Sequence, residues 1–231
     1  MDQNEINKWA LEVTKKISNF WDKISINNPI IRENGFSVFF SPVYSNPKLL
    51  IIGINPAGNF IRDNIKFNQH EIESKLPMIH DYFLSEEMDY DLAKYMRDLF
   101  NFDISILKNS VKINYYFFRT ASEDDLKQLK EFTILHDFCT DQIKNVIETI
   151  KPEKIITEGL GVFDKLYNLL NFKDNQIETI LSKNNKNVLI KKCSRDNLEL
   201  IGVIHPSGQW TKNIFIENKN IIIEELKKSF K

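Results

Sequence analysis

Cysteine is scarce in this sequence. Cys139 and Cys193 are the only two, and they do not form a C-x-x-C pair. Because two thiolates cannot by themselves hold a tetrahedral zinc ion or an iron–sulfur cluster, this count excludes cysteine-ligated centres of those kinds. We expect both thiols to be reduced and structural, and we predict neither a metal nor an organic cofactor.

An excess of charge of one sign is also missing. The sequence holds 31 Lys and Arg residues against 32 Asp and Glu residues, for a formal net charge of −1. This balance argues against a broad basic surface for nucleic acid, but it leaves room for a local basic patch.

Targeting and membrane signals are absent from the sequence. No apolar run reaches the roughly 20 residues that cross a bilayer. Residues 1–13 lack the basic and then apolar pattern of a signal peptide. We therefore expect a cytoplasmic protein without a membrane partner, and a monomer.

The sequence does contain strand patterns that alternate with helix patterns. Strands are expected at 48–53, 112–118, 154–157 and 198–204, with a hairpin or meander at 177–193, and helices at 5–25, 89–100, 124–150, 161–170 and 212–229. This order predicts an α/β fold: a three-layer α/β/α sandwich with a mostly parallel four-stranded central sheet. At 231 residues the chain is expected to form one domain, residues 1–231.

Two stretches have no clean periodicity. Residues 35–44 are expected to form an edge strand or an extended loop, because Pro42 interrupts their β pattern. Residues 59–90 are expected to form a long loop with one short helix around 71–80. Long loops at the ends of α/β strands often carry function.

Two turns stand out because each follows an apolar strand directly. Residues 48–58 read KLLIIGINPAG, and residues 198–208 read LELIGVIHPSG. The first turn contains Asn55 and the second contains His205, and each of these residues precedes a proline. Since the carboxyl ends of parallel strands form the ligand-binding edge of an open sheet, we expect Asn55 and His205 at the same edge.

These side chains suit hydrolysis without a protein nucleophile. The Asn55 amide can orient a water molecule, and His205 can donate a hydrogen bond to an oxygen that gains negative charge. Ser207 and Gly208 offer a hydroxyl and backbone N–H groups for a phosphate, just before the closing helix. Paired catalytic carboxylates, G-x-G-x-x-G and G-x-x-x-x-G-K-[ST] are absent, which disfavours nucleotide hydrolysis.

At these two turns the sequence resembles the uracil-DNA glycosylase superfamily. Residues 53–58, GINPAG, resemble the first signature of that family, in a form close to its mismatch-specific thymine/uracil branch. Residues 205–208, HPSG, resemble the second signature. The resemblance implies a metal-free DNA glycosylase that flips uracil or a related altered base out of DNA and hydrolyses its glycosidic bond in base excision repair. The cysteine count excludes the iron–sulfur branches.

The resemblance also implies roles for individual residues. Asn55 would orient the attacking water, and His205 would stabilise the departing base. Phe67, with Phe60 as the alternative, would stack on the flipped base. The base pocket would further include Gly53, Ile54, Pro56, Ala57 and Arg119, and DNA would be contacted by Ser207, Gly208, Gln209, Trp210 and Lys212.

Two positions depart from the family pattern. Many members have an asparagine at the end of the second strand that reads the base edge, and Arg119 occupies approximately that position here. Ala57 is small, which leaves room for a 5-methyl group and extends the expected substrates beyond uracil. Arg119 motivates an alternative function: a weak or inactive member of the same fold that binds nucleic acid, a free base or a nucleotide.

Structural interpretations of the same residues stay open at this stage. Asn55 can fill or cap a turn, and His205 can be a hydrogen-bonded histidine at a strand end. Phe67 can belong to the core, and Trp210 can pack under the closing helix. His80-Asp81 and His136-Asp137 are expected as surface pairs, because these histidines do not have the spacing of metal ligands.

Overall fold

The computed structural model describes residues 1–56, 61–62, 65–66, 75–84, 90–172, 176–206, 208 and 210–231. Residues 61–62 and 65–66 are described by their backbone only, as a small ladder of β2 (Ile61–Arg62) and β3 (Ile65–Lys66).

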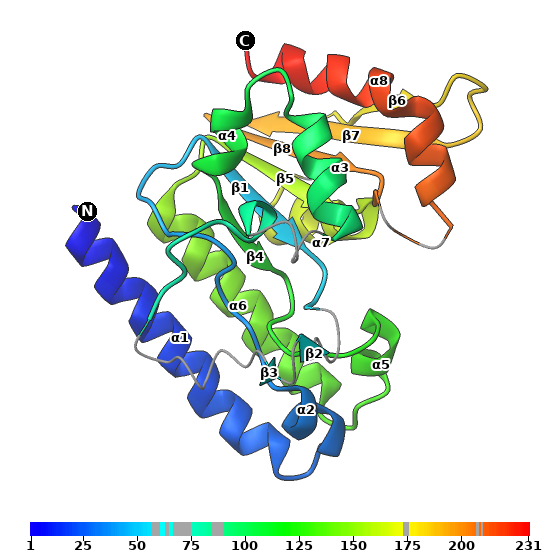
Figure 1. The fold of residues 1–231 in the computed structure, drawn as a ribbon. Coiled ribbons are helices and arrows are strands. Elements are labelled where there is room, and N and C mark those ends of the chain that lie inside the picture. The colour runs from blue at the N-terminus through cyan, green and yellow to red at the C-terminus, as the bar shows by residue number, and fades with distance from the viewer. Residues whose placement is uncertain are drawn as a thin grey trace.

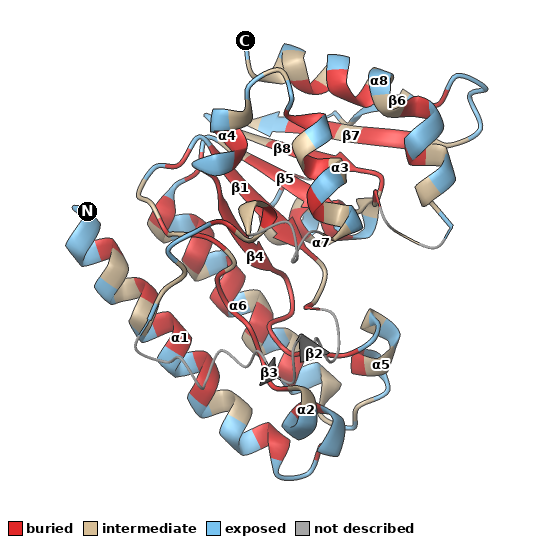
Figure 2. Ribbon diagram, in the orientation of Figure 1, coloured by how far each residue is buried: buried red, intermediate tan, exposed pale blue. Residues whose placement is uncertain are grey.

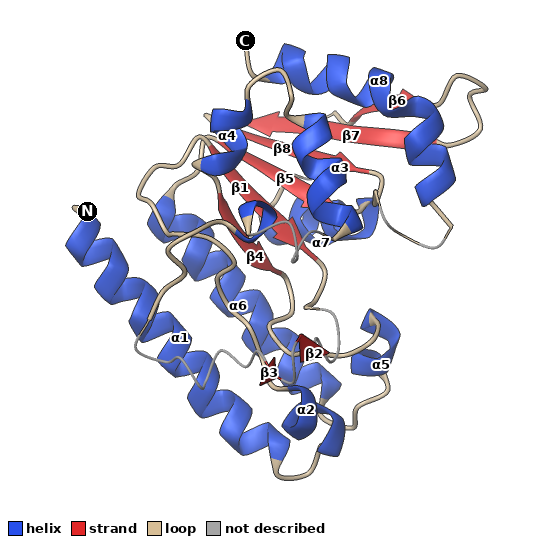
Figure 3. Ribbon diagram, in the orientation of Figure 1, coloured by secondary structure: helices blue, strands red, loops and turns tan. Residues whose placement is uncertain are grey.

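A six-stranded mixed sheet forms the centre of the fold (Figures 1 and 3). Its strands are β1 (Leu49–Gly53), β4 (Val111–Asn114), β5 (Lys154–Glu158), β6 (Glu178–Leu181), β7 (Val188–Arg195) and β8 (Leu198–Val203), in the order β4-β1-β5-β8-β7-β6. The pairs β4–β1, β1–β5 and β5–β8 are parallel, whereas β7 runs antiparallel to both β8 and β6. The predicted α/β class and the hairpin are confirmed. The predicted sheet size is wrong, because the hairpin extends the four parallel strands to six.

Helices cover both faces of this sheet. They are α1 (Gln3–Ser25), α2 (Pro29–Asn34), α3 (Asp91–Leu99), α4 (Ile104–Lys108), α5 (Glu123–Lys127), α6 (Phe132–Ile150), α7 (Leu160–Leu169) and α8 (Lys212–Ser229), with a 3-10 turn at Asp81–Phe83. One apolar cluster joins the sheet to α1, α6 and α7, and a second joins its other face to α3, α4 and α8. None of the helices in the described ranges is both long and apolar enough to cross a membrane.

Strand β1 shows why the sheet lies inside. Leu50 and Ile52 belong to the first cluster, and Leu49 and Ile51 belong to the second. Because successive side chains point to opposite faces, an unbroken apolar run fills both layers, as expected for a central parallel strand (Figure 2).

The opening helix starts two residues earlier than its apolar stripe indicates. Asp2 accepts hydrogen bonds from the backbone of Asn4 and Glu5, and the Glu5 side chain bonds back to Asp2. This capping box satisfies backbone N–H groups that would otherwise lack partners at the helix start.

Strand β4 is shorter than predicted. It ends at Asn114, although the apolar residues continue to Phe118. The residues that follow are buried against helices instead: the Tyr115 hydroxyl lies 2.9 Å from the hydroxyl of Thr140 on α6, and Phe118 packs on Phe20 of α1. Residues 115–118 are apolar because they are buried, although they are not part of a strand, and so their composition led to a strand prediction that was too long.

Other differences concern helices and loops. The predicted helix 124–150 is two helices, α5 and α6, and α4 was not predicted. Of the short helix expected around 71–80, residues 75–80 are not helical, and the rest lie outside the described residues. The segment 35–44 is extended, with isolated bridges from Phe36 to Phe118 and from Phe39 to Ile113.

Candidate functional site

Three positions meet in one row at the carboxyl ends of the parallel strands. Gly53, the last residue of β1, pairs in register with Asn114, the last residue of β4. On its other side β1 pairs with β5, which ends at Glu158. Strand alternation places these three on the same face as Ile51 and Ile156, the face covered by α3 and α8. This edge is where open α/β sheets bind ligands.

Gly53 makes room for its two neighbours. A Cβ atom on Gly53 would lie 2.2 Å from Oδ1 of Asn114 and 2.7 Å from Oε2 of Glu158. Both separations are shorter than real Cβ atoms tolerate, so the two side chains lean over the glycine into space that any other residue would fill. The sequence thus uses glycine here for close approach as well as for the turn.

Glu158 is a buried carboxyl group that forms no ion pair with any residue the structure describes. It is 4% exposed, and its Oε1 atom has no hydrogen-bond partner in the part of the chain that the structure describes. Burial, and then the negative charge of Asp81, raises the pKa of Glu158 well above its ordinary value. The raised pKa favours the protonated, neutral form of the side chain, and this form can donate a hydrogen bond.

His205 lies two residues after the end of β8 and packs beside Gly159, the residue that follows β5. A Cβ on Gly159, the residue after Glu158, would lie 3.7 Å from Cδ2 of His205, and Gly159 itself has a φ of +113°. The hydroxyl of Thr211 donates a hydrogen bond of 2.6 Å to the His205 carbonyl, which ties the turn to the start of α8. Burial, and then the charge of Lys112, lowers the pKa of His205, so the imidazole is neutral at neutral pH.

Asn55 lies just beyond β1 and is held by its amide nitrogen. Nδ2 donates to the Thr120 hydroxyl at 3.1 Å and to the Thr120 carbonyl at 3.2 Å, and it lies 3.2 Å from the carbonyl of Pro56. Within the described ranges Oδ1 accepts no hydrogen bond. With Nδ2 assigned by these acceptors, Oδ1 remains available to accept one from a water molecule.

A buried ion pair between Lys112 and Asp81 lies next to Gly53, Asn114 and Glu158, on the same face of the sheet. Lys112 precedes Asn114 on the same face of β4, and its ammonium group contacts Asp81 at 3.0 Å. The Tyr90 hydroxyl lies 3.3 Å from this ammonium, and the Tyr82 ring centroid lies 3.9 Å from it. Burial alone would raise the pKa of Asp81, but the Lys112 charge and the His80 and Tyr90 hydrogen bonds bring it below its ordinary value.

The expectation that His80-Asp81 is a surface pair is therefore wrong. His80 is buried, and its Nε2 atom lies 3.0 Å from the hydroxyl of Ser110. Burial lowers the pKa of His80. His136, by contrast, is half-buried on α6 and contacts the Tyr116 hydroxyl at 3.0 Å.

Arg119 does not stand at the end of the second parallel strand. Strand β4 ends earlier, at Asn114, and Arg119 is buried beside the extended segment 35–37. Its Nη2 atom donates to the hydroxyl of Ser37 at 2.6 Å, and its backbone N–H donates to Gly35. Burial lowers the pKa of Arg119 to about 10, which leaves it charged at neutral pH. The assignment of Arg119 to the strand end is corrected to Asn114.

The remaining predicted residues lie in different settings. Pro56 is buried and Ile54 is half-buried, both beside Asn55, and Gly208 packs against His205. Lys212 pairs with Asp91 at 2.6 Å. Trp210 is 85% exposed, so the alternative interpretation, that it packs under the closing helix, is wrong. Outside the described residues lie Ala57, Phe60, Phe67, Ser207 and Gln209.

Sequence reasoning missed Asn114 and Glu158. Asn114 was hidden inside an apolar run that was assigned to one long strand. Glu158 did carry a signal, since it is an acidic residue between an apolar strand and a glycine. A charged residue directly after a buried strand is a site candidate, because that edge is where ligands bind.

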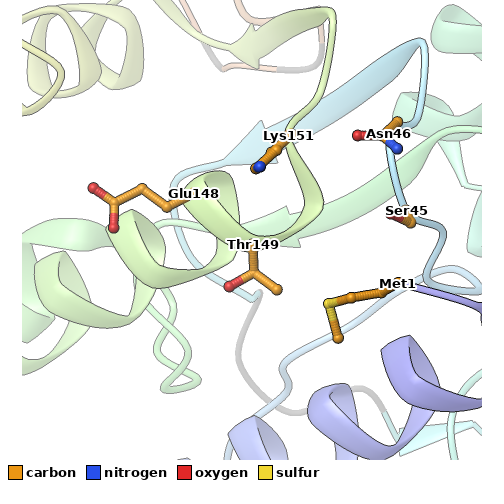
Figure 4. A pocket seen from close by; sticks show the side chains of 6 residues that line it. All are labelled: Met1, Ser45, Asn46, Glu148, Thr149 and Lys151. Atoms are coloured by element: carbon orange, nitrogen blue, oxygen red, sulfur yellow. The ribbon is translucent and has the colours of Figure 1, made fainter.

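A separate cavity of about 330 Å³ lies at the other end of β1 (Figure 4). Its lining comes from the loop before β1, the end of α6 and the first residue: Met1, Ser45, Asn46, Glu148, Thr149 and Lys151. Glu148, Asn46 and Lys151 are exposed there. This open hollow is remote from the row of Gly53, Asn114 and Glu158, and it brings no buried polar group to a common point.

Comparisons with known proteins give a weak match to one enzyme. No family model matches the chain. Two of the curated proteins that match are cysteine–tRNA ligases of Campylobacter jejuni: that of strain 81116 is 23% identical over 130 residues, and that of strain 81-176 is 22% identical over 130 residues. Each match covers 55% of this chain but 27% of the ligase, so the chain spans about a quarter of the length of these relatives.

Within the described residues, no group of three or more His, Cys, Asp and Glu side chains is arranged to hold a metal ion.

Proposed function

We propose that this protein is a DNA glycosylase of the uracil-DNA glycosylase superfamily, which hydrolyses the bond between deoxyribose and uracil or a related altered base. The observation that carries the proposal is the shared edge. Asn55 after β1, Asn114 at the end of β4 and His205 after β8 all lie at the carboxyl ends of parallel strands. The four adjacent parallel strands between two helix layers agree with the fold that the resemblance implies, and the β6–β7 hairpin extends it.

The proposed mechanism gives each residue one task. The base is flipped out of DNA, because its glycosidic bond cannot be reached within the stack. Asn114 offers an amide N–H and a carbonyl oxygen to the edge of the base. His205, as a neutral imidazole, donates a hydrogen bond to the carbonyl oxygen of the departing base.

Water completes the reaction. The bond from C1′ to the base breaks, and its electron pair leaves with the base. A water molecule positioned by Oδ1 of Asn55 adds to C1′, and its proton balances the charge of the released base. Because an amide is not a base at neutral pH, Asn55 orients the water without removing its proton. We therefore expect a slow enzyme that depends on leaving-group stabilisation.

The remaining parts of the proposal follow the resemblance. A phenylalanine, Phe67 or Phe60, stacks on the flipped base, and the small Ala57 admits a 5-methyl group. The turn at 205–212 contacts DNA, with the exposed Trp210 as the aromatic wedge. The protein acts as a monomer in the cytoplasm, on DNA that contains uracil or another altered base and without a cofactor.

The binding-only alternative has two motivations, Arg119 at the second strand end and the weak net charge. Since β4 ends at Asn114, the first no longer applies, whereas the net charge of −1 remains. The lack of a basic group at Asn55 still favours weak catalysis. Cysteine–tRNA ligation is not proposed, because the match spans about a quarter of those enzymes.

A cleavage assay tests the proposal. Oligonucleotides carrying uracil, T:G, hypoxanthine or xanthine, single- and double-stranded, are incubated with the protein and probed for abasic sites. We expect excision of uracil, abolished by Asn114→Ala and retained by Asn168→Ala, a matched exposed asparagine on α7. Absence of abasic sites on every substrate would overturn the proposal.

A further inference from the structure

Glu158 has no task in the mechanism above, yet its position is unfavourable. A buried polar group without a hydrogen-bond partner destabilises a fold even when it is neutral, and an ionised one destabilises it further. The neighbouring Asp81 is paired with Lys112, whereas Oε1 of Glu158 has no partner among the described residues. A methionine would fill similar space without this cost. The acid therefore calls for an explanation that involves a ligand.

The row supplies two donors around one acceptor. A neutral carboxylic acid has one O–H donor, and the Asn114 amide has N–H donors and one carbonyl acceptor. Both side chains approach the same point above Gly53, at 2.7 Å and 2.2 Å from the place of its missing Cβ. The complementary ligand edge is acceptor, donor, acceptor.

We propose that Glu158, as a neutral acid, donates a hydrogen bond to a carbonyl oxygen of the bound base, and that Glu158 and Asn114 together select an imide edge, C(=O)–N(H)–C(=O). Asn114 binds the ring N–H and one carbonyl oxygen, and Glu158 binds the second carbonyl. Uracil, thymine and xanthine carry this edge. Cytosine presents an amino group and an unprotonated ring nitrogen, and hypoxanthine lacks the second carbonyl. This inference rests on the proposed glycosylase function.

The proposal makes recognition sensitive to high pH. An ionised Glu158 would set a negative oxygen against a carbonyl oxygen and lose its donor. Among the residues that the structure describes, the titratable and charged groups on the same side include His80, Asp81, Tyr82, Tyr90, Arg97, Lys112 and His205. Of these, Asp81 contributes to the raised pKa of Glu158. His205 is neutral at and above neutral pH, so its protonation does not change across this range.

Three variants separate hydrogen-bond donation from other roles. Glu158→Gln keeps a donor of similar shape but cannot ionise, Glu158→Leu removes the donor, and Glu199→Leu is a matched control on β8. Single-turnover excision of uracil is measured from pH 6 to pH 10, and folding is checked by thermal melting. We expect wild type to slow at high pH, and Glu158→Gln to stay within about threefold of it at pH 7 without that additional slowing. Glu158→Leu should lose at least about tenfold, the scale of one decade in rate.

Two outcomes overturn the inference. An unchanged rate in folded Glu158→Leu removes any role in recognition, and a Glu158→Gln variant as slow as Glu158→Leu shows that proton transfer, not donation, is required. If no substrate is cleaved, the glycosylase proposal fails, and the role of Glu158 is tested separately by calorimetric binding of free uracil, xanthine and hypoxanthine. Binding of uracil and xanthine that is lost in Glu158→Leu supports the inference. If hypoxanthine binds as tightly as uracil, or if none of the three bases binds, the inference is overturned.

Discussion

Gly53 and Asn114 face each other across the β1–β4 pair, and a Cβ on the glycine would lie 2.2 Å from Oδ1 of the asparagine. The Asn114 side chain can therefore lie close to the backbone of β1 only because its partner in register is a glycine. The same glycine borders Glu158 on its other side. One position therefore controls the distance between two polar side chains that come from different strands.

Gly53→Ala is predicted to disable the site more than the fold. The new methyl group must displace Asn114 and Glu158, so excision should fall at least about tenfold, or about 1.4 kcal/mol. Gly161→Ala on α7 is the control, since nothing lies within 4 Å of its Cβ. That change should stabilise the protein by about 0.5–1 kcal/mol, the helical advantage of alanine over glycine. Rates and thermal melts measure both, and an active Gly53→Ala would contradict the crowding argument.

Asn55→Ala and His205→Ala are each predicted to slow excision at least about tenfold, a barrier increase of about 1.4 kcal/mol. The first loses the oxygen that orients water, and the second loses the donor to the leaving base. His136→Ala is the matched control on α6, where the imidazole contacts Tyr116. Full activity in both test variants would reject these roles even if the protein proved to be a glycosylase.

Lys112→Met is predicted to destabilise the fold by about 3–5 kcal/mol, because it leaves Asp81 buried and unpaired. Adding Asp81→Asn should recover part of this loss, since the remaining partner no longer carries a charge. Lys154→Met is the control: its pair with Glu199 is about one-fifth exposed and should contribute at most about 1 kcal/mol. Urea unfolding compares the four proteins, and equal losses in the two single variants would refute the burial argument.

Glu158→Gln is predicted to stabilise the protein increasingly as pH rises. Below the ordinary pKa of 4.5 both folded and unfolded wild type hold the proton, so the acid has no ionisation penalty. Above it the unfolded chain releases the proton while the folded chain keeps it. Wild type then loses up to about 1.4 kcal/mol per pH unit until the raised folded-state pKa is reached. Denaturant unfolding at pH 4 and pH 7 measures the difference in free energy of unfolding between wild type and Glu158→Gln. That difference would not change with pH if Glu158 were already ionised in the folded protein.

Trp210 is predicted to report DNA binding. The indole is 85% exposed in the turn after His205. Stacking against a base should shift and quench its fluorescence, and Trp210→Ala should weaken binding without changing the melting temperature, because the ring contributes little to the core. The control is a variant that keeps only Trp9, which packs against the core. Its fluorescence should not change when DNA is added.

The sequence predicts most of the framework because apolar periodicity is strong there. The closing helix, expected at 212–229, is observed as Lys212–Ser229, and β1 is observed where the run of Leu and Ile residues lies. The hairpin was predicted, but the sequence pattern does not show that β7 pairs with β8 and so extends the sheet. Pairing partners depend on contacts distant in the chain, which periodicity does not encode.

The row of polar side chains was harder to predict for a different reason. Tyr115 to Phe118 are as buried as a central strand, yet they pack irregularly against α1 and α6, so composition placed the strand end too late. Glu158 was passed over because its meaning depends on Gly53 and Asn114 in neighbouring strands. Local sequence identified the Asn55 and His205 turns, whereas the contacts between strands revealed their neighbours.

The register of the strands decides whether the polar side chains of the candidate site come together during folding. Gly53, Asn114 and Glu158 share one face only in the observed register, and a slip of one residue in β5 would turn Glu158 to the opposite face. Parallel strands pair through long connections, which close slowly. A refolded chain can therefore regain its helices while its strands are misaligned. Recovery of base binding would report the correct register, which recovery of helical circular dichroism cannot do.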